Sequence, residues 1–202
     1  MARIGLFGGT FDPPHTGHIE LAKRVLDDFN LSKIIFIPAG NPPHKQEKKK
    51  TDKIHRCEMV KLATQDFSQF EVSDFDIKNE KPNYSYITID HFKKEYPDSE
   101  IFFIIGADSF RDLPLWKNYE ELLTMCHFIV VARPDVKKED YYIKYTGDEP
   151  VPSVFFVEDF SYDLSSTQLR EQIPKGTYNE CDLPDGVLEY IEKNRLYPKE
   201  SL

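Results

Sequence analysis

The 202-residue chain lacks the features that mark several large classes of protein. It has three cysteines, Cys57, Cys126 and Cys181, which stand far apart and form no CxxC pair, so neither a disulfide framework nor a structural zinc site is expected. No window approaches the roughly 20 apolar residues that a membrane-spanning helix needs. The apolar run at the N-terminus is too short for a signal peptide. We therefore expect a cytoplasmic protein without a membrane partner.

Positive charge is also scarce, because 26 Lys and Arg stand against 35 Asp and Glu and give a formal net charge of −9. A chain this acidic is poorly suited to grip a nucleic-acid backbone, so no nucleic-acid partner is expected. An anionic substrate would have to be bound by a local cluster of cations. Aromatic residues, by contrast, are plentiful, with fifteen Phe and eleven Tyr, which predicts a folded rather than a disordered chain.

Short apolar runs alternate with helical patterns along the chain. Buried strands are expected at Ile4–Phe7, Ile34–Ile37, Phe70–Ile77, Ile101–Ile105, Phe128–Ala132 and Val154–Val157. Helices are expected at His18–Phe29, Ile54–Phe67, Tyr86–Glu95, Glu120–Met125, Ser166–Gln172 and Asp185–Asn194. This order predicts an α/β fold: a Rossmann-like, doubly wound, mainly parallel sheet with helices on both faces. Neither a repeat nor a linker is evident, so residues 1–202 are expected to form a single domain.

In such a sheet, ligands bind beyond the carboxyl ends of the strands. The polar segments that follow strands are Gly8–His18, Pro38–Lys45, Gly106–Trp116 and Arg133-Pro134, and a further one, Ser165–Arg170, opens a helix. The lysine-rich segment Gln46–Lys53 is expected to be a solvated connection, and the sequence does not reveal whether it closes over a ligand. These segments are where we look for function.

The first segment, Gly8–His18, leaves a strand and enters a helix. Its glycines allow the backbone to approach a ligand, and free N–H groups at a helix start favour an anion. His15 and His18 are three residues apart, so both can point to one side and donate to phosphate oxygens. Spacing alone also fits a capped turn with surface histidines, or a two-histidine metal site. Neither a Walker loop nor GxGxxG occurs in the chain.

The whole string from Gly8 to His18 resembles the GxFxPxHxGH signature of the nucleotidyltransferase superfamily. Other segments resemble bacterial nicotinate-nucleotide adenylyltransferases: PPHK at Pro42–Lys45, GxD…LPxW at Gly106–Trp116 and ISSTxIR at Leu164–Arg170. The resemblance runs from about Arg3 to Tyr197. The chain departs from the family pattern at Asp135, where Gly is usual, and at Asn83-Tyr84-Ser85, where Ser-Tyr-Thr is usual.

The resemblance implies the nucleotidyltransferase fold and an enzyme of NAD biosynthesis. Such an enzyme transfers an adenylyl group from ATP to nicotinate mononucleotide, giving deamido-NAD and pyrophosphate. The attacking group would be a phosphate monoester, whose second pKa of about 6 leaves it largely dianionic at neutral pH. It needs no general base, so the protein's task is to hold two anions in line and to neutralise the charge on the departing pyrophosphate.

The resemblance also implies roles for particular residues. The catalytic residues would be His15, His18, Lys45 and Arg170. Those binding ATP would be Gly8, Gly9, Thr10, Phe11, Gly106, Asp108, Arg133, Ser166 and Thr167. Those binding the mononucleotide would be His44, Ser85 and Trp116. Mg²⁺ would be carried by the ATP phosphates, without a metal site built by the protein.

Several of these residues have simpler explanations when taken alone. Trp116 is the only tryptophan, and a single tryptophan is more often a core residue, but its position after Leu113-Pro114 favours an aromatic face that stacks on a pyridine ring. Ser85 could bind the ring carboxylate. Asp108 could cap the following helix, and Arg170 could be a solvated helix residue.

Other functions stay open at this point. Sister adenylyl- or cytidylyltransferases with another phosphate acceptor share the first motif, although the PPHK and Trp116 segments count against them. Class I aminoacyl-tRNA synthetases are longer and carry a KMSKS-like loop that this chain lacks. A non-catalytic nucleotide-binding regulator should have lost a histidine or Arg170, and all are present. The sequence leaves open whether the chain forms a homo-oligomer, and how strongly it prefers the acid to the amide mononucleotide.

Overall fold

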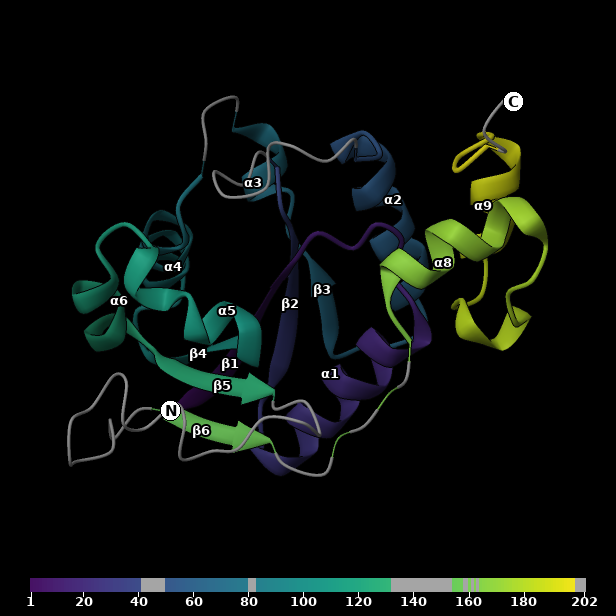
Figure 1. Ribbon diagram of the computed structural model, residues 1–202. Helices are drawn as coiled ribbons and strands as arrows, with labels where there is room; N and C mark the ends of the chain where they lie inside the picture. Colours follow the sequence, from purple (N-terminus) through teal and green to yellow (C-terminus); the bar gives the residue numbers. More distant parts are fainter. Residues whose placement is uncertain are drawn as a thin grey trace.

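The core of the fold is a six-stranded parallel sheet with the order β3-β2-β1-β4-β5-β6 (Figure 1). The computed structural model describes residues 1–40, 50–79, 83–131, 154–157, 160, 162 and 164–198. The strands are β1 Ala2–Gly9, β2 Lys33–Pro38, β3 Phe70–Val72, β4 Ser99–Gly106, β5 His127–Val131 and β6 Val154–Val157. The predicted parallel α/β sheet is therefore confirmed.

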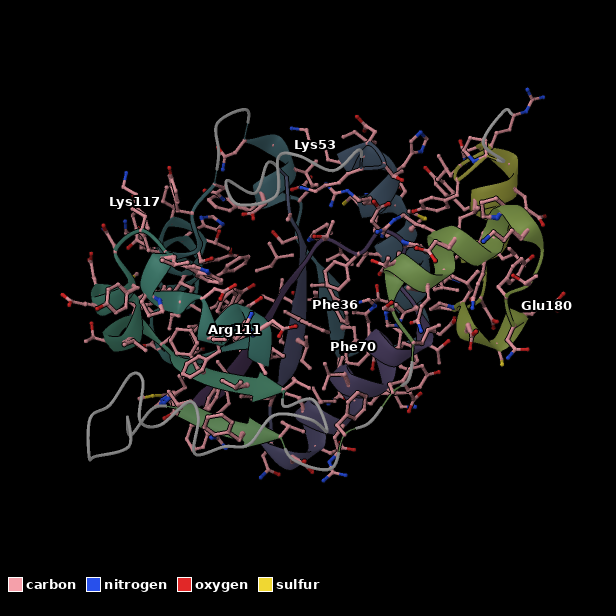
Figure 2. All side chains as sticks on the ribbon, in the orientation of Figure 1. Phe36, Lys53, Phe70, Arg111, Lys117 and Glu180 are labelled. Carbon is pink, nitrogen blue, oxygen red and sulfur yellow. The ribbon has the colours of Figure 1, made fainter. Side chains whose placement is uncertain are left out.

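Helices cover both faces of this sheet. They are α1 Thr16–Asp28, α2 Lys53–Thr64, α3 Phe75–Lys78, α4 Ser85–Glu95, α5 Ala107–Arg111, α6 Tyr119–Met125, α8 Ser166–Gln172 and α9 Val187–Lys193, with single 3-10 turns at Leu113–Leu115, Ile173–Lys175 and Glu180–Asp182. Because side chains alternate along a strand, Phe7 packs among residues of α1, α2, α8 and α9, whereas Leu6 packs among residues of α4, α5 and α6. Figure 2 shows Phe36 and Phe70, also on the α1 and α2 face, where their ring centroids are 5.4 Å apart.

Two expected elements differ from the structure. The strand predicted over Phe70–Ile77 ends at Val72, because the Ser73 Oγ accepts a hydrogen bond from the backbone N–H of Phe75 at 3.2 Å and the chain turns into α3. The segment Gly106–Trp116, read as a polar loop, is largely helical and holds α5 and the first 3-10 turn. Ala132, the expected end of the fifth strand, lies outside the described residues.

The order of the strands places the site. The chain builds β1, β2 and β3 outward in one direction and then returns to add β4 on the other side of β1. A crevice opens beyond the carboxyl ends of two such strands, where the order of the sheet reverses. Here those ends are Gly9 of β1 and Gly106 of β4. Within the described part of the chain, no helix is long and apolar enough to cross a membrane.

Candidate active site

The loop between β1 and α1 folds tightly over the end of its own strand. Phe11 has a left-handed backbone conformation, with φ of 50°, and its side chain is only 2% exposed. The ring lies over Gly9, where an added Cβ would come within 2.6 Å of the ring's Cζ atom. Gly9 is therefore required by a close approach, and the compact loop keeps the backbone of Gly8, Gly9 and Thr10 at the border of the crevice.

His15 and His18 lie together at the start of α1, as their spacing predicts. Their ring centroids are 3.8 Å apart, and the His18 ring also packs edge-on against Phe11, with centroids 5.0 Å apart. The backbone N–H of His15 donates to Nδ1 of His18 at 3.2 Å. Because Nδ1 accepts, a neutral His18 carries its proton on Nε2, which makes Nε2 a hydrogen-bond donor. His15 is 7% exposed, so the interpretation as surface histidines is wrong for it.

Burial keeps both histidines neutral. It lowers the pKa of His15 from 6.5 to about 4. Burial, together with the charge that His15 would carry, lowers the pKa of His18 well below its usual value. The Nδ1 atom of His15 is buried and has no hydrogen-bond partner among the described residues. An anion bound here would oppose both shifts, because a neighbouring negative charge favours the protonated ring.

Helix α8 is docked onto the same loop although it lies some 150 residues later in the chain. The Arg170 guanidinium donates through Nη1 to the carbonyl oxygen of Asp12 at 2.6 Å and through Nη2 to the Thr167 Oγ1 at 3.1 Å. The Ser166 hydroxyl donates to the carbonyl oxygen of Pro13 at 2.8 Å. The Ser165–Arg170 segment therefore lies against the first loop, and Arg170 is not merely a solvated helix residue.

Arg56 of α2 is a buried residue that supports the site and that the sequence analysis did not single out. Its side chain is buried, with 2% exposure, and it donates to carbonyl oxygens of three segments: Thr10 at 2.7 Å, Thr51 at 3.1 Å and Ala39 at 2.6 Å. It therefore ties the ends of β1 and β2 together beneath the crevice. The signal was present, because Arg56 shares helical spacing with the buried Val60 and Ala63.

Asp12 was part of the first motif but was given no role, and it is the second buried charge of this region. It is 2% exposed, and its carboxylate accepts hydrogen bonds from the Tyr197 hydroxyl at 2.7 Å and from the backbone N–H of Thr51 at 3.3 Å. Burial and the Asp12 charge raise the pKa of Tyr197, so the phenol stays protonated and donating. No local sequence pattern could have revealed a partner 185 residues away.

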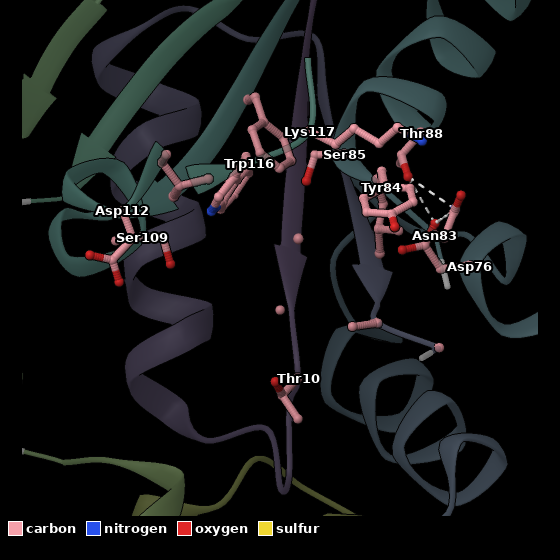
Figure 3. A pocket seen from close by; sticks show the side chains of 18 of the residues that line it. Thr10, Asp76, Asn83, Tyr84, Ser85, Thr88, Ser109, Asp112, Trp116 and Lys117 are labelled. Carbon is pink, nitrogen blue, oxygen red and sulfur yellow. Dashed lines mark hydrogen bonds between the residues drawn. The ribbon is translucent and has the colours of Figure 1, made fainter. Parts of the chain in front are cut away.

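A pocket of about 400 Å³ opens on the other side of the same loop (Figure 3). The ends of β1 and β4 form its floor, and its walls come from the start of α4 and from the chain around α5. Its lining includes Gly8, Gly9, Thr10, Gly40, Asp76, Asn83, Tyr84, Ser85, Thr88, Gly106, Asp108, Asp112, Trp116 and Lys117. The size is that of a typical small-molecule site.

Trp116 and Ser85 both line this pocket, as predicted. The indole of Trp116 is partly buried and packs edge-on against Phe103 of β4, with ring centroids 6.4 Å apart. The tryptophan is therefore anchored to the core and still borders the pocket. Ser85 is the first residue of α4, after Tyr84 at the capping position, so backbone N–H groups at the start of this helix face the same pocket.

A hydrogen-bonded group of three side chains shapes the wall beside Ser85. The Asp76 Oδ1 accepts from the Thr88 hydroxyl at 2.9 Å and from the Asn83 amide, which itself lies 3.2 Å from the Thr88 Oγ1. Burial raises the pKa of Asp76. The end of β2 meets this wall closely, since a Cβ on Gly40 would lie 2.0 Å from the carbonyl oxygen of Asp76. Of this group, only Asn83 was noted in the sequence, as a departure from the family pattern.

Asp108 and Gly106 lie at the opposite wall. The capping residue of α5 is Gly106, and Asp108 stands in the first turn, so the alternative in which Asp108 caps this helix is wrong. Its carboxylate lies 3.7 Å from Nη1 of Arg111 and lines the pocket. The position of a Cβ on Gly106 has no atom within 4 Å, which leaves its backbone open to a ligand.

Some predicted site residues cannot be placed. His44, Lys45 and Arg133 lie outside the described residues, as do Asp135 and residues 46–49. Among the residues that are described, no group of three or more His, Cys, Asp or Glu side chains could hold a metal ion. The histidine pair alone supplies two nitrogen atoms, fewer than the three protein ligands usual in catalytic zinc sites.

Comparison with known proteins agrees with this geometry. The cytidylyltransferase-like family matches residues 6–172. The Bacillus subtilis nicotinate-nucleotide adenylyltransferase is 40% identical over 197 residues, which covers 98% of this chain and 99% of that protein. The fold is similar to that of the Plasmodium falciparum nicotinic acid mononucleotide adenylyltransferase complexed with NaAD, with a TM-score of 0.79, 20% identity and 98% of each chain covered. The chain therefore belongs to the cytidylyltransferase-like family and, within it, to the nicotinate-nucleotide adenylyltransferases.

Proposed function

We propose that this chain transfers the adenylyl group of ATP to nicotinate mononucleotide and releases pyrophosphate, forming deamido-NAD for NAD biosynthesis. The observation that carries the proposal is the shared border formed by Gly8, Gly9 and Thr10. This backbone lines the pocket, and the loop that continues from it carries the histidine pair. A phosphate held there would stand between an acceptor in the pocket and a triphosphate over the histidines.

The chemistry asks little of the protein beyond placement and charge. An oxygen of the mononucleotide phosphate attacks the α-phosphorus of ATP, a new P–O bond forms, and the bond to the β-phosphate breaks with its electron pair leaving on pyrophosphate. The acceptor is already anionic at neutral pH, so no proton has to be removed. Pre-positioned donors aimed at the developing charge supply the catalysis. His18 fits this role, because its neutral ring presents Nε2–H.

The other residues are assigned either to the phosphates and ribose of ATP or to the mononucleotide. We assign the triphosphate to His15, Arg170, and the backbone N–H groups of Ser166 and Thr167, since the Ser166 hydroxyl already donates to Pro13. The ribose of ATP is assigned to Gly106 and Asp108. Lys45 and His44 are assigned to the phosphates and the mononucleotide, and Arg133 to the adenine side. The pyridine ring is assigned to Trp116 and its substituent to the start of α4 at Ser85.

Mg²⁺ enters this scheme as part of the substrate. The described phosphate side offers histidines, an arginine and backbone N–H groups, which are ligands for phosphate oxygens, while the carboxylate of Asp12 is buried and bonded to Tyr197 and Thr51. Mg²⁺ prefers oxygen ligands and usually keeps several waters while it bridges substrate phosphates. The residues thus fit MgATP, in which the cation neutralises part of the phosphate charge.

The test is a pyrophosphate-release assay with MgATP and a panel of acceptors. We expect turnover with nicotinate mononucleotide, weaker turnover with nicotinamide mononucleotide and none with phosphopantetheine. Preference for phosphopantetheine would favour a sister adenylyltransferase, and release of pyrophosphate with CTP in place of ATP would favour a cytidylyltransferase. Binding of nucleotides without any turnover would favour a regulator.

Direct transfer can be tested separately. Incubation with ATP labelled at the α-phosphate, without acceptor, should leave no stable label on the protein, because the acceptor supplies its own nucleophile. Acid-stable or hydroxylamine-sensitive labelling would show an adenylylated intermediate and contradict the mechanism.

A further inference from the structure

The charged side chains on the pocket wall differ in the partners that they have. Among the described lining residues, Asp76, Asp108, Asp112 and Lys117 can carry charge. Arg111 lies beside two of the carboxylates, with Nη1 at 3.7 Å from Asp108 and Nε at 3.3 Å from Asp112. Asp76 accepts hydrogen bonds from its neighbours in the wall. Within the described part of the chain, no carboxylate lies within ion-pair distance of the Lys117 ammonium.

The Lys117 side chain reaches across the rim of the pocket. It follows Trp116 directly in the chain, and its Nζ atom lies over the Tyr84 ring at 4.9 Å from the centroid. Tyr84 stands at the capping position of α4, so the ammonium is held beside the start of that helix. Figure 3 shows the side chain of Lys117 extending over Ser85 toward Tyr84, at the end of the pocket opposite Thr10.

The two ends of the pocket therefore suit the two ends of a mononucleotide. The phosphate must lie at the Gly8–Thr10 backbone, because the reaction takes place beside the histidines. The ring then points toward Trp116, and its substituent points toward Ser85 and Lys117. A ring carboxylate placed there would meet an ammonium that has no competing carboxylate among the described residues, whereas a neutral amide would gain no charge interaction.

We infer that the Lys117 side chain is a specificity-determining group that favours a mononucleotide with an anionic ring substituent over its amide. The inference deepens the proposed function and rests on it. Lys117 is exposed, so its contribution is that of a solvent-screened ion pair, worth up to about 1 kcal/mol or about fivefold in kcat/KM. It adds to whatever the backbone donors at the start of α4 provide.

The experiment compares the parent enzyme with Lys117→Gln and Lys117→Arg, using nicotinate and nicotinamide mononucleotides. In Lys117→Gln we expect KM for the acid to rise about fivefold with kcat little changed, and kinetics with the amide to stay as in the parent. Lys117→Arg should keep the parent ratio. The control is Lys94→Gln, which changes an exposed lysine near the far end of α4 that pairs with Asp90 at 2.6 Å. It removes the same charge away from the pocket and should change neither substrate.

Ionic strength provides a second signature. Screening weakens an exposed charge pair, so the acid-to-amide ratio of the parent should fall as salt rises, and that of Lys117→Gln should fall less. An unchanged ratio in Lys117→Gln would overturn the inference. An equal loss for both substrates would overturn it too, since it would place the ammonium on the common phosphate.

A binding titration separates this inference from the proposed function. Quenching of the single tryptophan, Trp116, reports binding of either mononucleotide without any turnover. If the parent fails to release pyrophosphate, the proposed function fails, while weaker binding of the acid alone to Lys117→Gln would still support the role of Lys117. Equal affinities of parent and variant for the acid would contradict that role whatever the activity.

Discussion

The site has a phosphate side, formed by the loop Gly8–His18 and helix α8, and a pocket side, formed by the start of α4 and the chain around α5. The two sides are built in different ways. On the phosphate side, groups from remote parts of the chain hold one loop: Arg56 binds the carbonyl of Thr10, Arg170 binds that of Asp12, and Tyr197 binds the Asp12 carboxylate. On the pocket side, the contacts come from neighbours in sequence or from exposed groups, such as Asn83 with Thr88 and Lys117 with Tyr84.

This difference fits the role proposed for each side of the site. The in-line attack proposed above demands donors fixed in place before the substrates arrive, and long-range, partly buried hydrogen bonds supply that rigidity. Choice between two acceptors of similar shape needs only a modest difference in binding free energy at one end of the ring. The motifs at Gly8–His18 and Leu164–Arg170 form the phosphate side, whereas the motif at Gly106–Trp116 contributes to the pocket wall. The departure at Asn83-Tyr84-Ser85 also lies on the pocket wall, where substitution can adjust selectivity without moving the reacting atoms.

Arg56 gives the strongest test of rigidity on the phosphate side. Arg56→Met leaves buried carbonyl oxygens of three segments without a donor, and we expect it to lower the free energy of unfolding by about 4 kcal/mol. Urea unfolding measures the loss. Arg24→Met is the control, because Arg24 lies on exposed α1 surface beside Asp28 and should cost under about 0.5 kcal/mol. Similar losses in both variants would show that Arg56 does not hold the loops.

The neutral histidines predict a dependence of stability on pH. In the unfolded chain His15 binds a proton near its ordinary pKa of 6.5, and in the folded chain only near 4. Between these values the unfolded state binds more protons, so stability is lost as the pH falls, by about 3 kcal/mol over the interval. Urea unfolding at several pH values should show this slope, and a His15→Asn variant should show a shallower one. Equal slopes would mean that His15 titrates normally in the folded protein.

The same residues predict the effect of ATP. Because phosphates favour the protonated rings, ATP binding should take up protons near neutral pH, which calorimetry in buffers of different ionisation enthalpy detects. Binding of nicotinate mononucleotide to the pocket should take up fewer, since none of the described histidines lines it.

His18 tests whether the phosphate side acts on the transition state. His18→Ala removes the Nε2–H donor, and we expect kcat to fall by about 10²-fold or more, the scale for losing one pre-organised donor. KM for ATP should change much less. Steady-state kinetics with saturating mononucleotide makes the measurement. Activity within threefold of the parent would leave His18 a packing residue between Phe7 and Phe11.

The sequence predicted the strands and helices of the fold well and the contacts around the site poorly, for physical reasons. Apolar runs such as Ile101–Ile105 are buried on both faces of the sheet. Their pattern therefore predicts a strand and indicates that the sheet is parallel. The predicted strand Phe70–Ile77 was too long, because Phe75 and Ile77 are apolar residues of helix α3 and continue the apolar pattern. The turn at Ser73 redirects the chain before them.

The site divides in the same way. The association of His15 with His18 follows from three-residue spacing, and the resemblance singled out Arg170 as a catalytic residue. The Asp76 group joins residues only 7 and 12 positions apart along the chain. Arg56 and Tyr197 owe their roles to contacts that form only after the sheet has brought distant segments together. Their own neighbours in sequence carry no trace of those partners, apart from the inward helical position of Arg56.

Trp116 tests whether a change on the pocket side leaves the phosphate side unaffected. Its ring lines the pocket, which His15 and His18 do not. Trp116→Ala should therefore weaken nicotinate mononucleotide by about tenfold and leave KM for ATP nearly unchanged, on the scale of one lost stacking contact of about 1.4 kcal/mol. Trp116→Phe should retain much of the affinity, because an aromatic face remains.

Tyr119→Ala is the matched control for Trp116, because Tyr119 packs against the same apolar cluster but does not line the pocket. If Tyr119→Ala weakens the mononucleotide as much as Trp116→Ala does, the loss reflects general loosening of that cluster and the stacking role is wrong. If Trp116→Ala raises KM for ATP as much as KM for the mononucleotide, the pocket and the histidine loop are coupled. The division into a rigid catalytic side and an adjustable selective side would then fail, since a change in the wall would reach the reacting phosphates.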